Sequence, residues 1–166
     1  IMGLARKICR TPLVIQVGVR STTPTGIRHA VYPVSHELKT ELLLRLILKD
    51  PGMDSVLVFT RTKSRANRLA QKLERARISI SLLHGDRSQA QRLQALEQFR
   101  HGRSRVLVAT DVAARGIDIK DISHVINFDV PSTPDDYIHR IGRTGRVQAT
   151  GVAFSLVTRD EEKMIR

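Results

Sequence analysis

Apolar runs of strand length alternate along most of this sequence with segments of helical periodicity. The strand-length runs are rich in β-branched residues and leucine, and they are Ala30–Val34, Val56–Thr60, Ile78–Leu83, Arg105–Ala109, His124–Phe128 and Val152–Val157. Such runs are typical of strands that are covered on both faces. Because strands and helices alternate, the sequence predicts an α/β fold in which a mostly parallel sheet lies between two layers of helices.

The segments between these runs carry helix faces and helix start signals. Apolar residues at helical spacing are Ala66, Leu69, Ala70 and Leu73 in one segment, and Leu93, Leu96 and Phe99 in another. Ser88 and Gln91 have the spacing of a capping box. Thr133 and Asp136 repeat that spacing, with Pro134 at the favoured first helical position. We therefore expect helices to begin at these two places.

Length and charge favour a single domain with a polyanionic partner. The chain has 166 residues, of which 41% are hydrophobic, and this is enough for one full core. Its formal net charge is +12, from 28 Lys and Arg against 16 Asp and Glu. A field of that sign attracts nucleic acid, although a protein whose cationic faces are only solvated would have the same composition.

Cysteine content and apolar runs indicate the cellular setting. Cys9 is the only cysteine, so no intrachain disulfide can form. The longest apolar run, Leu42–Leu48, is interrupted by Arg45 and is too short to cross a membrane. We expect a soluble, cytoplasmic protein.

The first residues do not follow the alternating scheme. A short helical pattern is followed by Val14–Val19, which has the composition of a strand, and then by a turn-rich stretch. We interpret residues 1–24 as the end of a preceding domain plus a linker, and residues 25–166 as the domain itself. On this interpretation the chain is a piece of a longer protein.

The segment His139–Arg146 contains three arginines and a histidine interleaved with two glycines. Glycines allow the backbone to approach a ligand closely, and the arginine fork matches the geometry of phosphate oxygens. The segment therefore predicts a phosphate clamp, with a basic surface turn as the plainer alternative.

Polar residues also follow predicted strands, where parallel α/β sheets bind their ligands. The segments concerned are Ala109–Asp118, Val56–Lys63 and Leu83–Arg92. In the last of them Gln89 and Arg92 lie three residues apart, on one helical face. Helix caps, turn residues and solvent-facing helix residues are the alternatives to ligand contacts here.

Together these segments resemble the C-terminal RecA-like domain of DEAD-box RNA helicases, which belong to superfamily 2. The matches are motif IV at Val56–Lys63, the Q-x-x-R element at Gln89–Arg92, motif V at Ala109–Asp118 and motif VI at His139–Arg146. The resemblance runs from about Val31 to Arg159, with the motifs in order. It implies a three-layer RecA-like domain and, for the parent protein, an ATP-dependent RNA helicase that hydrolyses ATP.

The resemblance also implies roles for individual residues. On the ATP side it assigns the ribose to Asp118, and the γ-phosphate to the catalytic arginine fingers Arg143 and Arg146. On the RNA side it assigns contacts with the sugar-phosphate backbone to Thr60, Arg61, Arg92, Thr110 and Gly116. His139, supported by Gln89, would couple the two sides.

Two elements of a complete motor are missing from this sequence. It has no G-x-x-x-x-G-K-[ST] loop to cradle phosphates and no D-E-A-D tetrapeptide to hold Mg²⁺. The resemblance implies that an N-terminal RecA-like domain of the same parent supplies both, and that this fragment alone is inactive. Two other functions stay open, an RNA-binding module without a nucleotide and a DNA helicase or repair translocase. With 4% aromatic residues, backbone recognition is favoured over base readout.

Overall fold

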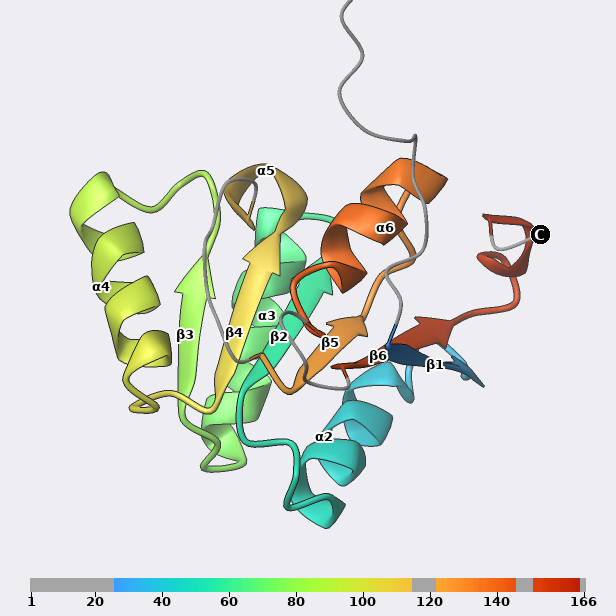
Figure 1. The fold of residues 1–166 in the computed structure, drawn as a ribbon, viewed down its shortest axis with the longest axis horizontal. Coiled ribbons are helices and arrows are strands. Elements are labelled where there is room, and N and C mark those ends of the chain that lie inside the picture. Colours follow the sequence, from blue (N-terminus) through green and yellow to red (C-terminus); the bar gives the residue numbers. More distant parts are fainter. Residues whose placement is uncertain (1–25, 115–121, 146–150, 165–166) are drawn as a thin grey trace, which may run out of the picture.

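A computed structural model describes residues 26–114, 122–145 and 151–164, which form one sheet with helices on both faces (Figure 1). The strands are β1 (Ile27–Pro33), β2 (Val56–Thr60), β3 (Ile80–Leu83), β4 (Val106–Thr110), β5 (His124–Asn127) and β6 (Gly151–Val157). They lie in the order β1-β6-β5-β2-β4-β3, and every pairing is parallel. The expected α/β fold is confirmed.

The helices divide between the two faces because neighbouring residues of a strand point to opposite sides of the sheet. The helices are α2 (Lys39–Lys49), α3 (Lys63–Arg75), α4 (Gln89–Arg100), α5 (Asp111–Ala114) and α6 (Pro134–Ile141), and a short 3₁₀ turn spans Glu162–Met164. Val56 and Val58 of β2 pack in one core layer with α2 and α3. Leu57 and Phe59 pack in the other with α4 and α5. Ile141 of α6 packs against β1 and β6.

The two outer strands differ most from the sequence-based bounds. β1 begins at Ile27 rather than Ala30, because Ile27 already pairs with Gly151 of β6. The two residues that follow it are polar and exposed, so the apolar run began later than the strand. β3 begins at Ile80 rather than Ile78, because Ile78 takes part in the turn that closes the end of α3. The N–H of Ile78 donates to the carbonyl of Leu73, and the N–H of Arg77 donates to the carbonyl of Glu74. Arg77 has a φ of 60°. This pattern is a Schellman motif, built here without glycine.

Of the two expected capping boxes, only one is complete. Ser88 Oγ accepts from the N–H of Gln91 at 3.3 Å, and Gln91 Oε1 accepts from the N–H of Ser88 at 3.1 Å. Thr133 likewise caps α6 by accepting from the N–H of Asp136, and Pro134 lies in the first turn as expected. However, the Asp136 carboxylate accepts from the Thr133 hydroxyl rather than from its backbone, so this second box is half made.

The expected inward face of α4 was partly wrong. Phe99 is buried and Leu96 is partly buried, but Leu93 is 58% exposed. Ala95 lies inward instead. Because α4 packs against the edge strand β3, a narrow face is enough to cover it, and Leu93 falls outside that face.

Residues 1–24, interpreted above as a preceding domain end and linker, lie outside the described residues. Among the described helices, none has the length and apolar character that a membrane crossing requires.

Candidate functional site

The carboxyl ends of β2, β4 and β5 bring the segments singled out in the sequence to one edge of the sheet. β2 pairs with both β4 and β5, and Thr60 is the register partner of Thr110. Thr60 is fully buried and Thr110 is 9% exposed. The two threonines therefore lie side by side, but the Thr60 side chain does not reach the surface in this structure.

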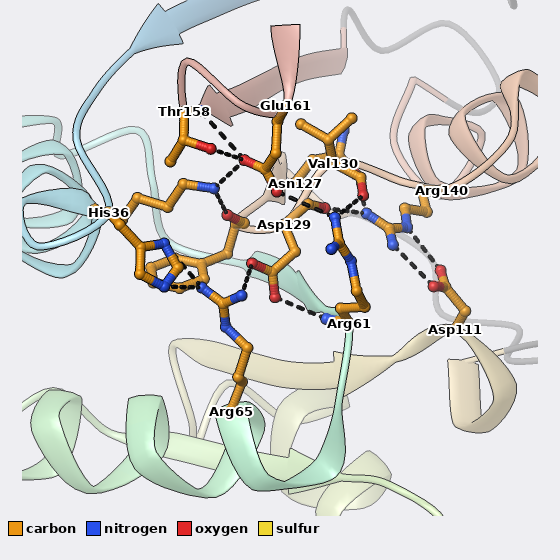
Figure 2. A network of polar contacts seen from close by, with 12 residues as sticks. His36, Arg61, Arg65, Asp111, Asn127, Asp129, Val130, Arg140, Thr158 and Glu161 are labelled. Carbon is orange, nitrogen blue, oxygen red and sulfur yellow. Dashed lines mark hydrogen bonds and ion pairs between the residues drawn. The ribbon is translucent and has the colours of Figure 1, made fainter. Parts of the chain in front are cut away.

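Arg61 follows Thr60 and lies at the surface, with a side chain that is 44% exposed. Its backbone N–H donates to Asp129 Oδ2 at 2.8 Å. Its guanidinium donates to Glu161 Oε1 at 3.2 Å and, more weakly, to the carbonyl of Val130 at 3.4 Å (Figure 2). Part of the arginine is thus held by protein oxygens, and part remains open to solvent.

Arg140 is the central connection of this edge (Figure 2). Its Nε and Nη2 donate to the two carboxylate oxygens of Asp111 at 2.6 and 2.8 Å. Its Nη1 donates to Asn127 Oδ1 at 3.0 Å and to the carbonyl of Asp129 at 2.7 Å. The guanidinium carbon also lies 5.0 Å from the centroid of the Phe59 ring. One buried arginine therefore joins β2, α5, the end of β5 and α6.

No sequence pattern assigned a role to Arg140 or paired it with Asp111. Arg140 is 2% exposed, and its bidentate bond with Asp111 fixes α6 against the end of β4. The signal that could have found this pair is an arginine inside a short helix, on its inward side, combined with an acid directly after a buried strand.

A small hollow opens beside Arg140, with a volume of about 20 Å³, which is room for one water-sized group. His139 and Arg143 line it together with Asp111, Asp136 and the Phe59 ring. Arg143 Nε donates to the carbonyl of His139 at 3.3 Å, so the two residues are neighbours at the last turn of α6. The structure thus brings the predicted coupling histidine and one predicted arginine finger together.

The predicted residues of α4 lie on the neighbouring side of the edge. Arg92 Nη2 reaches the carbonyl of Ala113 at 3.5 Å, which places Arg92 over the segment that follows Thr110. Gln89 is the exposed first residue of α4. Among the described residues no hydrogen bond joins Gln89 to His139, so their cooperation stays a prediction. Three further candidates, Gly116, Asp118 and Arg146, lie outside the described residues.

A buried ion pair beneath this edge was not foreseen from the sequence. Lys39 Nζ donates to Glu161 Oε2 at 2.6 Å and to the carbonyl of Phe128 at 2.8 Å. Thr158 donates to the same carboxylate from its backbone N–H and its hydroxyl. Burial by itself would raise the pKa of Glu161, but the hydrogen bonds and the charge of Lys39 outweigh it and hold that pKa below its usual value.

Two histidines near the strands have structural surroundings. His84 is buried, and its Nε2 lies 3.1 Å from Asn67 Oδ1. His124 is buried in β5, 5.6 Å from the Phe154 ring centroid. Burial is the main cause that lowers the pKa of both histidines. Within the described residues, no three His, Cys, Asp or Glu side chains gather in a way that could hold a metal ion.

A wholly parallel sheet between helices, with basic segments and an acid paired to a buried arginine at the carboxyl ends of its strands, is the architecture of a RecA-like motor domain. Residues 38–148 match the family model described as the helicase conserved C-terminal domain. The chain belongs to this family, as the C-terminal RecA-like domain of a DEAD-box RNA helicase.

Similar proteins agree with this assignment. The chain is 42% identical over 161 residues to the ATP-dependent RNA helicase RhlB of Pseudomonas syringae pv. tomato, covering 97% of this chain and 40% of that protein. It is 41% identical over 167 residues to the DEAD-box ATP-dependent RNA helicase CshA of Bacillus subtilis, covering 100% of this chain and 33% of that protein. The crystal structure of E. coli DEAD-box protein SrmB has 45% identity and a TM-score of 0.77, covering 81% of this chain and 79% of that one. The chain thus spans 40% or less of the length of the two helicases compared by sequence.

Proposed function

We propose that this chain is half of an RNA-remodelling motor, whose parent hydrolyses ATP in a cleft between this domain and an N-terminal RecA-like domain. The observation that carries the proposal is the Arg140–Asp111 clamp, which anchors the end of α6, with His139 in its last turn and Arg143 just after it, beside the strand ends. An anchored, cationic loop of this kind suits a phosphate that arrives from a second domain. The similarity to named ATP-dependent RNA helicases supports the reaction.

Phosphoryl transfer is catalysed mainly by positioning and by stabilisation of charge, so a site divided between two domains reacts only when they close. On closure, Arg143 and Arg146 would reach the γ-phosphate, and Asp118 would contact the ribose. Mg²⁺, held by the N-terminal domain, would supply neutralisation of phosphate charge. In this scheme Arg140 touches no ligand and acts by holding α6 in place.

The RNA path would cross the same edge on the side of β2 and α4. The open part of Arg61 and the guanidinium of Arg92 would meet phosphates, and so would Thr60, Thr110 and Gly116. His139, with Gln89, would transmit RNA binding to the arginines, because it lines the same hollow as Asp111 and Arg143. Such contacts recognise the sugar-phosphate backbone rather than the bases.

The decisive test is Arg143→Ala in the full-length parent, measured as RNA-stimulated ATP turnover. Loss of an arginine finger lowers turnover by about 10³-fold or more. Arg75→Ala, which removes an exposed arginine at the end of α3, is the matched control and should keep normal turnover.

The same pair of variants separates this proposal from an RNA-binding module that uses no nucleotide. That module would predict unchanged ATP turnover in Arg143→Ala together with weaker RNA binding. Near-normal turnover in a folded Arg143→Ala protein would therefore exclude the finger role.

A further inference from the structure

A groove of about 250 Å³ lies between the start of α2 and the outer face of α3, away from the hollow beside Arg140. Leu69 and Phe128 form its apolar floor, and both side chains are almost fully buried. Above the floor, Arg65, Arg68 and Lys72 line the groove from α3. These three positions follow helical spacing, so they form one continuous basic rim.

Two of these rim cations are available to a ligand. Arg68 and Lys72 are exposed, and neither forms an ion pair with any residue in the part of the chain that the structure describes. Glu37 is the one acidic residue that lines the groove. The rim therefore carries a surplus of positive charge directly above an apolar surface, a combination that attracts an anion bearing an apolar group.

The third cation, Arg65, is held in place at the inner end of the groove (Figure 2). Its Nη1 lies 3.1 Å from Asp129 Oδ1 and forms an ion pair with it. The geometry of this contact is not that of a hydrogen bond. Its Nη2 lies 3.0 Å from Nε2 and 3.3 Å from Nδ1 of His36, which also lines the groove. Because the wall is organised in advance, a ligand would lose little entropy in ordering it.

We propose that this groove binds an acidic segment of a partner protein, which places one apolar side chain over Leu69 and Phe128 and its carboxylates against Arg68 and Lys72. An RNA strand fits less well, because it would bring a phosphate at every nucleotide past Glu37 and has no aliphatic side chain for the floor. The proposal does not depend on ATP or on the arginine fingers.

The groove is also connected to the proposed RNA edge through one buried carboxylate. Asp129 faces Arg65 with one oxygen and accepts from the backbone N–H of Arg61 with the other, at 2.8 Å. A charged ligand in the groove lies beside Arg65 and changes the electrostatic environment of its partner Asp129. The Arg61 amide is therefore a built-in reporter of occupancy.

The test is a titration of the ¹⁵N-labelled 166-residue chain with the peptide acetyl-Asp-Glu-Leu-Glu-Asp-amide, followed by NMR. We expect shifts confined to the amides of α3, the start of α2 and Arg61. Arg68→Glu with Lys72→Glu should weaken binding by about tenfold or more, since two attractive contacts become repulsive, and every tenfold is about 1.4 kcal/mol. Lys49→Glu with Arg103→Glu makes the same change in net charge at exposed positions that do not line the groove, and it should bind like the parent chain.

Three outcomes would overturn the proposal. The first is an equal loss in both double variants, which would mean attraction by net charge alone. The second is equal binding of the neutral peptide acetyl-Asn-Gln-Leu-Gln-Asn-amide, or of a peptide with serine in place of leucine. The third is an oligouridine that shifts the groove amides at lower concentration than the acidic peptide, which would assign the groove to RNA. If the charge reversal unfolds the chain, Arg68→Gln with Lys72→Gln provides the same comparison, with an expected loss of about threefold.

Discussion

Two arginines of one eight-residue segment, Arg140 and Arg143, illustrate how surroundings, rather than residue type, decide a role. Arg140 is buried and donates hydrogen bonds from all three guanidinium nitrogens, whereas Arg143, three residues later, is half-buried and lines the hollow. A guanidinium can satisfy Asp111 and two further oxygens at once because its five donors form a rigid planar fork. Position relative to the end of α6 therefore separates a structural arginine, inside the helix, from a proposed catalytic one, just after it.

This contrast predicts that Arg140→Lys destabilises the domain, because lysine cannot make the bidentate bond and leaves Asn127 or Asp129 without its donor. We expect a loss of about 2 kcal/mol or more in the free energy of unfolding, measured with urea. Arg143→Lys serves as the control and should change that free energy by less than about 0.5 kcal/mol. Equal stability of the two variants would contradict the clamp.

The Lys39–Glu161 pair predicts a defined dependence on pH. The pKa of Glu161 is lower in the folded chain than in the unfolded chain. Its carboxylate therefore contributes to the free energy of unfolding at pH values above its unfolded pKa of about 4.3. That contribution is lost as the pH falls through the folded pKa, because the unfolded chain then binds more protons.

Glu161→Gln isolates this effect. At pH 7 the variant should lose about 3 kcal/mol of unfolding free energy, because Lys39 remains buried without its counter-charge. The difference in unfolding free energy between the unchanged chain and Glu161→Gln should become smaller as the pH falls below about 4. Urea unfolding at several pH values measures it. A constant difference across that range would show that the charge of Glu161 is not responsible.

At the scale of elements, the same residue spacing at two helix starts gives two different caps. The Ser88–Gln91 box closes on itself within four residues, so it forms as the local sequence predicts. At α6, the Asp136 side chain binds the Thr133 hydroxyl instead, and the same spacing gives a different bond. The two caps therefore differ in how many backbone groups they satisfy.

Ser88→Ala should accordingly cost about 1 kcal/mol of unfolding free energy, the usual effect of removing an N-cap side chain. Ser64→Ala, inside the first turn of α3 and exposed, makes the same chemical change at a position that is not a cap. It should be neutral within about 0.5 kcal/mol, because alanine is a good helix former. Thermal or urea unfolding of both variants distinguishes a cap effect from a general serine effect.

For the whole molecule, the net charge of +12 and the basic edge of the sheet predict weak RNA binding that depends strongly on salt. If the contacts are with phosphates, oligouridine and oligoadenosine should bind the chain with similar affinity. The affinity for both should fall with the same slope as salt rises. Fluorescence anisotropy at two or more salt concentrations measures this. A strong preference for one base at an unchanged slope would instead require a site that reads bases.

The sequence by itself determined the fold class, most strand positions, the complete cap at Ser88 and the order of the motifs. Val56–Thr60, for example, is a strand with the bounds expected from its apolar run. These features depend on the apolar pattern and on hydrogen bonds within a few residues, so local sequence carries the information. The exposed Leu93 shows the limit of that information, since its periodicity alone did not reveal which face α4 would bury.

Only the tertiary structure decided the strand order, the Arg140–Asp111 clamp and the Lys39–Glu161 pair. Lys39 and Glu161 are 122 positions apart in the chain, and no local pattern links them. They meet because β1 lies beside β6 and β6 lies beside β5, a pairing set by how the helices pack on the sheet. The partners of a buried charge are the groups that the folded core places next to it. A buried charge without a partner would carry a large desolvation cost.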